Sequence, residues 1–526
     1  MFFIYILIIS YCFSQNPIDF YLYGDNIHTI IGGFQNGIDK PRDLDFNPLH
    51  DNELWILNEG ESPYANNTEY INYVCVPENS ELMFTIYDSY SDGICCESGE
   101  GSYEVIGCDN TFVYGGDFES SESTIFTADV SCESECPNGN IELSIIISTD
   151  NWGKETSWEL IDNISNHIYA NRLAPGGSTV TFFEAGLDNQ TSEYRKDSYS
   201  RHFMNTASAL SFDDYGFFAN TLECKDANNN PNGLFSGPTL WNSDFTVYAA
   251  VNQEGPLLGS HLDMIHQSPY SMGIEHAGQG NVYWVYDGYH SAVVRYDFAT
   301  PHEYGGHDHS DGKVWRYGEI NLQREPGVSS HMVLDDNSNT LYIADTGNNR
   351  ILFFDVNSGV FDYELTPYGE SLDQYWMMKD AEWNVFINDG LDKPSGIDVY
   401  DNRLIVSDYS SGDIIIYDIS NYSPVELGRI NTGHDNKIMG ITIGPNQNIW
   451  YVNYTDNEVV RIDYNILFGD VNFDTVLDIL DLVSIISFIV GDQDFNDNQI
   501  YFSDLNQDQI INILDVVALV SLILDN

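Results

Sequence analysis

The stretch His331–Asp355, HMVLDDNSNTLYIADTGNNRILFFD, decides the fold because it alternates short apolar runs with polar turns. Two apolar runs, Leu341–Asp345 and Arg350–Asp355, are separated by a turn of Thr, Gly and two Asn, and a third run, His331–Asp335, lies just upstream. Runs rich in Val, Ile, Tyr and Phe, bounded by Gly, Asn and Asp, are typical of β-strands joined by tight turns. The stretch therefore predicts a three-stranded antiparallel meander.

The same pattern recurs at irregular intervals along the chain. A single meander cannot bury both its faces, so recurrence indicates units that pack side by side. The other copies are Pro41–Gly60, Ala209–Glu223, Met272–Asp297, Pro394–Asp418 and Met439–Asp463. These units resemble NHL repeats, each of which forms one blade of a β-propeller. The resemblance implies a mainly β protein built on a six-bladed NHL-type propeller.

The first of these units is interrupted. It lacks a third strand until Gly176–Gly186, so we expect residues 62–175 to be an insertion between two parts of the propeller, 16–61 and 176–465. A loop between strands accepts such an insertion because closing a long loop costs little more than closing a short one.

The insertion is rich in cysteine. After the N-terminal segment seven cysteines remain, and six of them fall here: Cys75, Cys95, Cys96, Cys108, Cys132 and Cys136. In an exported chain this clustering predicts local disulfides, whose pairing stays open. Cys224 is the odd one and is expected to be a buried free thiol. The predicted insertion is thus a β-rich module that contains disulfides.

Two stretches of the insertion, Phe84–Val105 and Ser148–Leu160, resemble two motifs of a small β-rich module of secreted bacterial proteins, in reversed order. Asp88 and Asp92 offer clustered oxygens for Ca²⁺, to which Asp150 and Glu155 add further candidates. The alternative is that these residues serve as turn and capping residues beside a disulfide.

The charge balance and the N-terminus narrow the possible partners. Asp and Glu number 81 against 19 Lys and Arg, a formal charge of −62, which argues against nucleic acids and anionic membranes as partners. Residues 1–14 are apolar but too short to cross a bilayer, so they are typical of a signal peptide, and no later run could span a membrane. We expect a secreted protein, released or attached to the cell surface.

Histidines provide the candidate chemistry of the propeller. Loops that enter the innermost strands of such propellers line one rim of the central channel, and several histidines precede or start a predicted first strand. Neutral imidazoles are common ligands of zinc, copper and iron, so the pattern predicts a transition-metal or ligand site at this rim. The alternative is an ordinary structural role for each residue. The candidates are His202, His261, Asp263, His266, His307, His309 and His331.

A specific activity does not follow from the resemblance. NHL propellers include a zinc-dependent amidating lyase whose metal-binding histidines stand at blade starts, and only His331 matches that pattern here. The equivalent places in the last two blades hold Ser395-Gly396 and Met439-Gly440. A GxSxG motif, which would indicate a nucleophilic hydrolase, is missing from the sequence.

The C-terminal residues 466–526 contain two copies of an acidic loop followed by an apolar helix. Oxygen ligands fall at loop positions 1, 3, 5, 7 (a backbone carbonyl), 9 and 12, the spacing that wraps a loop around Ca²⁺. The tandem resembles a type I dockerin, which implies a small all-α calcium-binding domain that attaches the chain to a protein partner or a surface. The ligands are Asp470, Asn472, Asp474, Val476, Asp478 and Asp481, then Asp504, Asn506, Asp508, Ile510, Asn512 and Asp515.

Two departures from the dockerin pattern bear on its partner. Loop position 6 holds Thr475 or Gln509 in place of the usual Gly. Apolar pairs, Ile479-Leu480 and Ile513-Leu514, stand where cellulosomal dockerins often carry polar residues that recognise the partner. The alternative is a calcium-stabilised cap without a partner.

Two functional hypotheses follow. In the first, the propeller rim recognises a glycan, peptide or protein ligand while the dockerin-like module attaches the chain. In the second, a metal-dependent lyase or hydrolase works at the histidine-rich rim, and the association of dockerins with polysaccharide-degrading enzymes points to polysaccharide as its substrate.

Overall fold

The computed structural model describes residues 16–525 apart from short gaps at 24–25, 62–63, 65, 89–90, 97–98, 109, 131–135, 138, 166, 173–174, 231, 422, 465–466, 475, 496, 507 and 509. The expected signal peptide and Cys132 lie outside the described residues.

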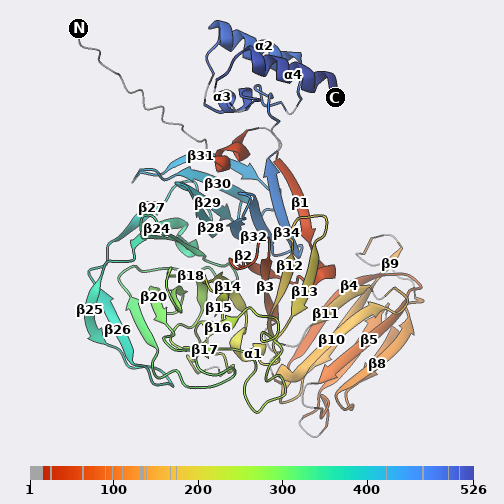
Figure 1. Ribbon diagram of the computed structural model, residues 1–526. Coiled ribbons are helices and arrows are strands. Elements are labelled where there is room, and N and C mark those ends of the chain that lie inside the picture. Colours follow the sequence, from red (N-terminus) through yellow and green to blue (C-terminus); the bar gives the residue numbers. More distant parts are fainter. Residues whose placement is uncertain are drawn as a thin grey trace, which may run out of the picture.

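Six sheets form a ring in the described part of the chain. Each contains four antiparallel strands that run from the centre outwards as one blade, and one sheet has two further strands (Figure 1). Blade 1 contains β2 (Pro41–Phe46), β3 (Leu54–Glu61), β12 (Gly176–Phe183) and β13 (Thr191–Arg195); blade 2 contains β14 (Ala207–Phe212), β15 (Phe217–Leu222), β16 (Thr239–Asn242) and β17 (Asp263–Met264). Blade 3 contains β18 (Ser271–His276), β19 (Val282–Asp287), β20 (Ala292–Asp297) and β21 (Lys313–Tyr317); blade 4 contains β22 (Met332–Asp335), β23 (Thr340–Asp345), β24 (Arg350–Asp355) and β27 (Trp383–Ile387). Blade 5 contains β28 (Pro394–Tyr400), β29 (Arg403–Asp408), β30 (Asp413–Asp418) and β31 (Val425–Asn431); blade 6 contains β32 (Ile438–Ile443), β33 (Ile449–Asn453), β34 (Glu458–Tyr464) and β1 (Asn26–Gly32).

Blade strands bury both faces, which explains their nearly continuous apolar sequences. In β29, Leu404 and Val406 pack against blade 4, whereas Ile405 between them packs against blade 6. The mainly β fold expected from the repeats is therefore confirmed, with an apolar core between each pair of neighbouring blades rather than one central core.

Two long-range pairings complete the ring. β1, from the N-terminal part of the chain, pairs with β34 as the outermost strand of blade 6. β12 pairs with β3 to supply the missing strand of blade 1, although more than a hundred residues separate them in sequence.

One hairpin of blade 4 joins a different sheet. β25 (Val360–Glu364) and β26 (Gln374–Lys379) lie between β24 and β27 in sequence, but β26 pairs in parallel with β21 and widens blade 3 to six strands. The apolar pattern of this hairpin in the sequence does not distinguish its strands from ordinary blade strands. The turn between β25 and β26 is thereby placed beside blade 2.

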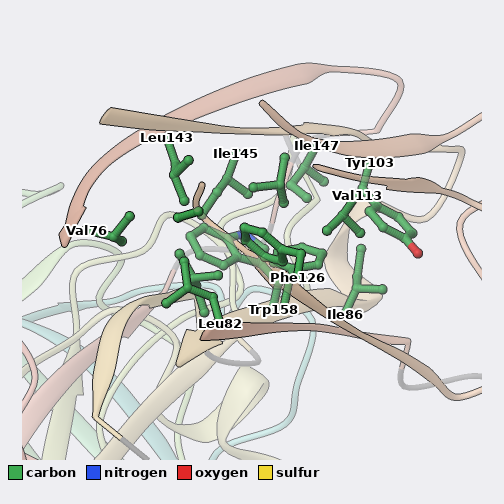
Figure 2. Packing of buried hydrophobic residues seen from close by; sticks show 14 of the residues in the cluster. Val76, Leu82, Ile86, Tyr103, Val113, Phe126, Leu143, Ile145, Ile147 and Trp158 are labelled. Atoms are coloured by element: carbon green, nitrogen blue, oxygen red, sulfur yellow. The ribbon is translucent and has the colours of Figure 1, made fainter. Parts of the chain in front are cut away.

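The segment between β3 and β12 folds as a sandwich of two four-stranded sheets (Figure 1). Figure 2 shows side chains of both sheets meeting in a core around Trp158, Leu143 and Phe126. One sheet contains β4 (Glu69–Pro77), β9 (Asn140–Ser148), β6 (Ser102–Gly107) and β7 (Asn110–Gly115), and the other contains β11 (Ile168–Arg172), β10 (Thr156–Asp162), β5 (Glu81–Asp88) and β8 (Ser121–Thr127).

Disulfides are present in this sandwich, as the clustering of cysteines predicts. Cys75 pairs with Cys136, and the neighbours Cys95 and Cys96 pair with each other. Cys224 is a free thiol, as expected, but the residue is half-buried rather than buried. Its thiol lies beside the Ser236 hydroxyl, and desolvation raises its pKa to about 12.

The C-terminal residues form α2 (Ile479–Val490), α3 (Asp497–Ser503) and α4 (Ile513–Asp525). Ile485 of α2 and Leu519 of α4 are buried together in a small apolar core. Phe502 of α3 packs on Phe20 at 5.0 Å between ring centroids, so the helices lie against the N-terminal segment of the ring (Figure 1). None of the described helices is long and apolar enough to cross a membrane.

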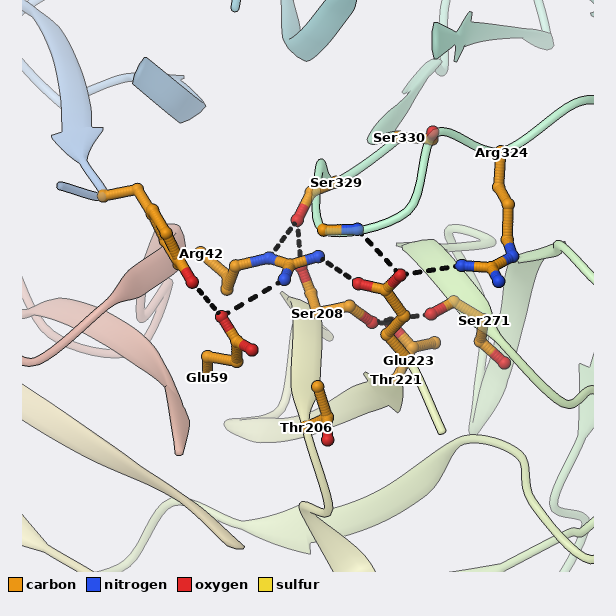
Figure 3. A network of polar contacts seen from close by, with 12 residues as sticks. Arg42, Glu59, Thr206, Ser208, Thr221, Glu223, Ser271, Arg324, Ser329 and Ser330 are labelled. Carbon is orange, nitrogen blue, oxygen red and sulfur yellow. Dashed lines mark hydrogen bonds and ion pairs between the residues drawn. The ribbon is translucent and has the colours of Figure 1, made fainter. Parts of the chain in front are cut away.

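A buried ion network lies where the inner strands meet (Figure 3). Arg42 of β2 is fully buried, and its guanidinium reaches Glu223 of blade 2 at 2.8 Å and Glu59 of β3 at 3.3 Å. Glu223 also pairs with Arg324 at 2.8 Å, and Nε of Arg42 donates to the Ser329 hydroxyl. One guanidinium thus joins blades 1 and 2 to the segment between blades 3 and 4.

We expect Arg42→Met to lower the free energy of unfolding in urea by about 3–5 kcal/mol, because it removes the cation of a buried ion network: Glu59 loses its guanidinium and Glu223 keeps only Arg324. Arg429→Met is the matched control, since Arg429 pairs with Glu426 at the surface, where such a pair contributes about 0–1 kcal/mol. Equal losses in the two variants would contradict the structural role of this network.

The raised pKa of Cys224 predicts its reactivity. At pH 8 the native thiol stays protonated, whereas the thiol of the unfolded chain has a pKa near 8.5. Iodoacetamide should therefore label Cys224 only after unfolding. Because the folded-state pKa is the higher one, the native state loses stability as pH rises above the unfolded value. Mass spectrometry of native and urea-unfolded protein checks this; rapid native labelling would refute it.

Candidate metal centre

A histidine-rich pocket, here the histidine pocket, lies between the outer strands of blades 2 and 3. Its residues come from α1 (Ser200–Phe203), from β17 and its flanks, from the loop between β20 and β21, and from the turn between β25 and β26. The cavity has a volume of about 510 Å³. The cavity is lined by His202, His261, His266, His307, His309 and Glu370. We include Asp263 and His302 in the histidine pocket because their ligand atoms lie close to that of His309.

Four imidazoles of the pocket are fixed through Nδ1. Each Nδ1 faces an oxygen that can only accept, so Nδ1 carries the hydrogen and the neutral ring keeps its lone pair on Nε2. This is the orientation that protein groups impose on metal-binding histidines. The pairs are His261 with the Leu258 carbonyl at 2.9 Å, His266 with Glu370 Oε2 at 3.0 Å, His302 with the Glu303 carbonyl at 2.7 Å and His309 with Asp263 Oδ1 at 2.7 Å.

A fifth imidazole approaches one of these four. Nε2 of His202 lies 3.3 Å from Nε2 of His266. The two rings come from α1 and from the segment after β17, and they are 64 residues apart in the sequence.

Carboxylates complete two groups that share His309. Ligand atoms of Asp263, His302 and His309 lie within 4.8 Å of one another, and so do those of His266, His309 and Glu370. Nε2 of His302 and Oδ2 of Asp263 are buried and have no hydrogen-bond partner among the described residues. Buried polar atoms normally have a hydrogen-bond partner, so these two atoms indicate that a ligand binds here.

Burial keeps most of these imidazoles neutral. Burial and the neighbouring charge of His266 lower the pKa of His202 to about 3, and burial followed by the charge of His302 holds the pKa of His261 well below its usual value. Burial also lowers the pKa of His266 and His302. For His309, burial lowers the pKa, but the hydrogen bond and charge of Asp263 outweigh it and the pKa is raised.

Aromatic rings hold two of the imidazoles in place. Phe235 stacks on His266 with 3.5 Å between centroids, and Phe203 stacks on His261 with 3.7 Å. These contacts restrict ring rotation, so the Nε2 atoms are positioned before any ligand arrives.

The positions of the candidate residues differ in part from the expectation. His202, His261, Asp263, His266 and His309 lie together, and the exposed His307 lines the same cavity. The site lies at the outer strands and not at the channel rim, because β17 is the outermost strand of blade 2.

His331 is separate from this group. Its Nδ1 lies 3.1 Å from Asp43 Oδ2 in the central channel.

Two residues of the pocket were not among the candidates predicted from the sequence. His302 belongs to the same histidine-rich phrase as His307 and His309, which could have revealed it, whereas Glu370 reaches the pocket only through the pairing of β26 with β21.

The two C-terminal loops have equivalent hydrogen bonds. In the first loop, the amide of Asp474 donates to Asp470 and the amide of Asp478 donates to Asp481; in the second, Asp508 and Asn512 make the same contacts. Asp470, Asp481 and Asp515 are buried. The remaining candidates Asn472, Val476, Asp504, Asn506 and Ile510 lie in the same two loops.

In the sandwich, ligand atoms of Asp88, Asp92 and Glu155 lie within 4.8 Å of one another. Oδ2 of Asp88 accepts hydrogen bonds from the amides of Asp92 and Gly93, which is the capping contact of a tight turn. Burial and the charges of Asp92 and Asp88 raise the pKa of Asp150, so this carboxyl belongs to the same acidic group.

Comparison with known proteins assigns no family. No protein-family model and no curated protein matches the chain. Solved structures that match include auxiliary nutrient binding proteins from Bacteroides ovatus (TM-score 0.33, 9% identity, 76% of this chain and 99% of that chain) and Bacteroides thetaiotaomicron (0.33, 10%, 74% and 95%). A nidogen/laminin complex also matches (0.27, 10%, 53% and 76%). Similarity this low carries no functional argument.

Proposed function

We propose that this chain is an exported metalloprotein that binds a transition metal ion in the histidine pocket. The observation that carries the proposal is the set of four imidazoles whose Nδ1 atoms are fixed, which leaves Nε2 of each ring as the atom that would bind a metal. Neutral imidazole nitrogens suit zinc, copper, iron and nickel. The disulfides Cys75–Cys136 and Cys95–Cys96 support export, because such bonds persist in oxidising surroundings.

The approach of His202 to His266 supports the same proposal. Two nitrogens bound to one tetrahedral zinc ion at about 2.0–2.1 Å stand roughly 3.3 Å apart. The Nε2 atoms of His202 and His266 are 3.3 Å apart. Glu370 accepts the Nδ1 hydrogen of His266, which is the partner that commonly orients a metal-binding imidazole.

The proposed activity is metal-dependent hydrolysis or elimination on a ligand that enters the cavity. A bound transition metal would activate water or polarise a carbonyl. The cavity volume of about 510 Å³ lies within the range of small-molecule sites, roughly 300–1,000 Å³. Recognition of a glycan, peptide or protein without turnover is the second candidate, favoured by the aromatic walls Phe203 and Phe235.

For the C-terminal helices we propose a dockerin-like attachment module. The equivalent contacts of the two acidic loops support one Ca²⁺ in each. Apolar side chains are exposed at matching helix positions: Ile479, Leu480 and Val483 in α2, and Ile513, Leu514 and Val517 in α4. Such a paired apolar face suits a protein partner rather than a free surface. A further Ca²⁺ is proposed at Asp88, Asp92 and Glu155.

The metal proposal predicts about one equivalent of zinc or copper retained by the full-length chain after dialysis. His266→Ala and His309→Ala should each abolish retention, whereas His50→Ala, at an exposed histidine, should retain the metal. Glu370→Gln should weaken metal affinity by about 10–100-fold because it removes only the partner of an imidazole. Elemental analysis and a competitive chelator measure these changes; no retained transition metal would overturn the proposal.

The calcium proposal predicts that Asp470→Ala and Asp504→Ala in the full-length chain each remove one Ca²⁺ from the binding stoichiometry measured by calorimetry. The reason is that loop position 1 supplies a carboxylate ligand at the centre of each loop. Asp494→Ala, an exposed aspartate between α2 and α3, is the matched control. Unchanged stoichiometry in both loop variants would contradict the assignment.

A further inference from the structure

The central channel contains a second cavity, here the channel cavity, that the metal proposal does not use. Its volume is about 290 Å³, and residues of the innermost strands of all six blades line it. Pro48, Asp214, Gly278 and Asp336 line one end and are exposed, so the cavity opens to solvent there. His331 lines it as a buried residue.

Three carboxylates from alternate blades face this cavity: Asp45 of β2, Glu275 of β18 and Asp398 of β28. Each accepts a hydrogen bond from a backbone amide of the next blade. The donors are Phe212 to Asp45 at 3.0 Å, Leu334 to Glu275 at 3.0 Å and Ile443 to Asp398 at 2.6 Å. The carboxylates are therefore held in fixed positions around the channel by the ring itself.

The electrostatic balance of the channel cavity is strongly negative. Its lining residues include seven carboxyl groups but no Lys or Arg among the described residues. Burial, then the charges of nearby carboxylates, raise the pKa of Asp45 to about 7 and that of Glu275 well above its usual value. Like charges gathered in one cavity repel one another, and a bound cation would relieve that repulsion.

Two buried polar atoms of this cavity lack a partner. Nε2 of His331 and Oδ2 of Asp213 have no hydrogen-bond partner among the described residues, and the two residues are 5% and 2% exposed. Buried polar groups are normally satisfied, so both atoms indicate a ligand with hydrogen-bonding groups. Nδ1 of His331 is already engaged by Asp43, which leaves Nε2 as the atom for that ligand.

The size of the cavity selects the class of cation. A single metal ion can contact three carboxylates only if their oxygens lie within about 4.8 Å of one another. Among the described residues, no such group contains Asp45, Glu275 and Asp398, so one bare metal ion cannot contact all three. The volume of about 290 Å³ equals roughly ten waters of 30 Å³. Apolar residues such as Phe212, Ile397 and Ile441 also line the cavity. An alkyl chain that carries amines can contact both kinds of residue.

We propose that the channel cavity binds a small organic ammonium ligand, such as a linear diamine or polyamine, through Asp45, Glu275 and Asp398. Ammonium groups donate to the carboxylates, and the methylene chain contacts the apolar residues of the lining. This site is independent of the histidine pocket, because no described residue lines both cavities.

Calorimetry on the full-length chain with 1,4-diaminobutane and spermidine tests the proposal. The uncharged isostere 1,4-butanediol should bind at least about tenfold more weakly, because charge-assisted hydrogen bonds are absent. Glu275→Gln and Asp398→Asn should each weaken diamine binding at least about tenfold. Glu119→Gln removes an equal charge at an exposed position of the sandwich and should leave the affinity unchanged.

The outcomes separate the alternatives. Equal affinity for diamine and diol, or equal affinity in the wild-type chain and both channel variants, would overturn the proposal. Ca²⁺ binding in the channel that diamines fail to displace would also overturn it, in favour of a metal site. If Glu275→Gln does not fold, as judged by circular dichroism, Asp398→Asn alone decides the result. His266→Ala should bind the diamine normally, which distinguishes this site from the metal centre.

Discussion

Closure of the ring is the constraint on which the rest of this structure depends. A blade exposes two apolar faces, and each finds its partner only in a neighbouring blade, so the first and last blades must meet. Ile56 and Val180 of blade 1 pack with Val452 and Val459 of blade 6 in the core that completes the ring. The N-terminal strand β1 also closes the ring, because it pairs with β34, the last strand of the propeller in the sequence.

Ring closure also creates both candidate sites, in different ways. The channel exists because six innermost strands surround one axis, and its carboxylates are fixed by amides of the following blade. The histidine pocket instead depends on outer strands and on the displaced hairpin β25–β26, which carries Glu370 to His266. A rigid ring thus presents two cavities of opposite character, one rich in imidazole and one rich in carboxylate.

Neither the sandwich nor the C-terminal helices contribute a described residue to the lining of either cavity. The sandwich interrupts blade 1 between β3 and β12, and the helices contact the N-terminal segment through Phe20 and Phe502. Insertion between strands is possible because β12 still completes the sheet next to β3. Attachment through the helices would therefore leave the propeller free to bind its own ligands.

The sequence by itself determined the blades, because turn residues and paired apolar runs such as Leu341–Asp345 and Arg350–Asp355 are local signals. It also placed the strand missing beside β3 within Gly176–Gly186, since an incomplete meander needs a third strand, and β12 pairs with β3 there. Only the tertiary structure decided which histidines meet. His202 and His331 were both candidates for one site at the channel rim, yet Asp43 holds His331 in the channel, while His202 faces His266. No sequence pattern around Glu370 predicts that it lies in the histidine pocket. Its position there depends on the parallel pairing of β26 with β21, which the neighbouring sequence does not indicate.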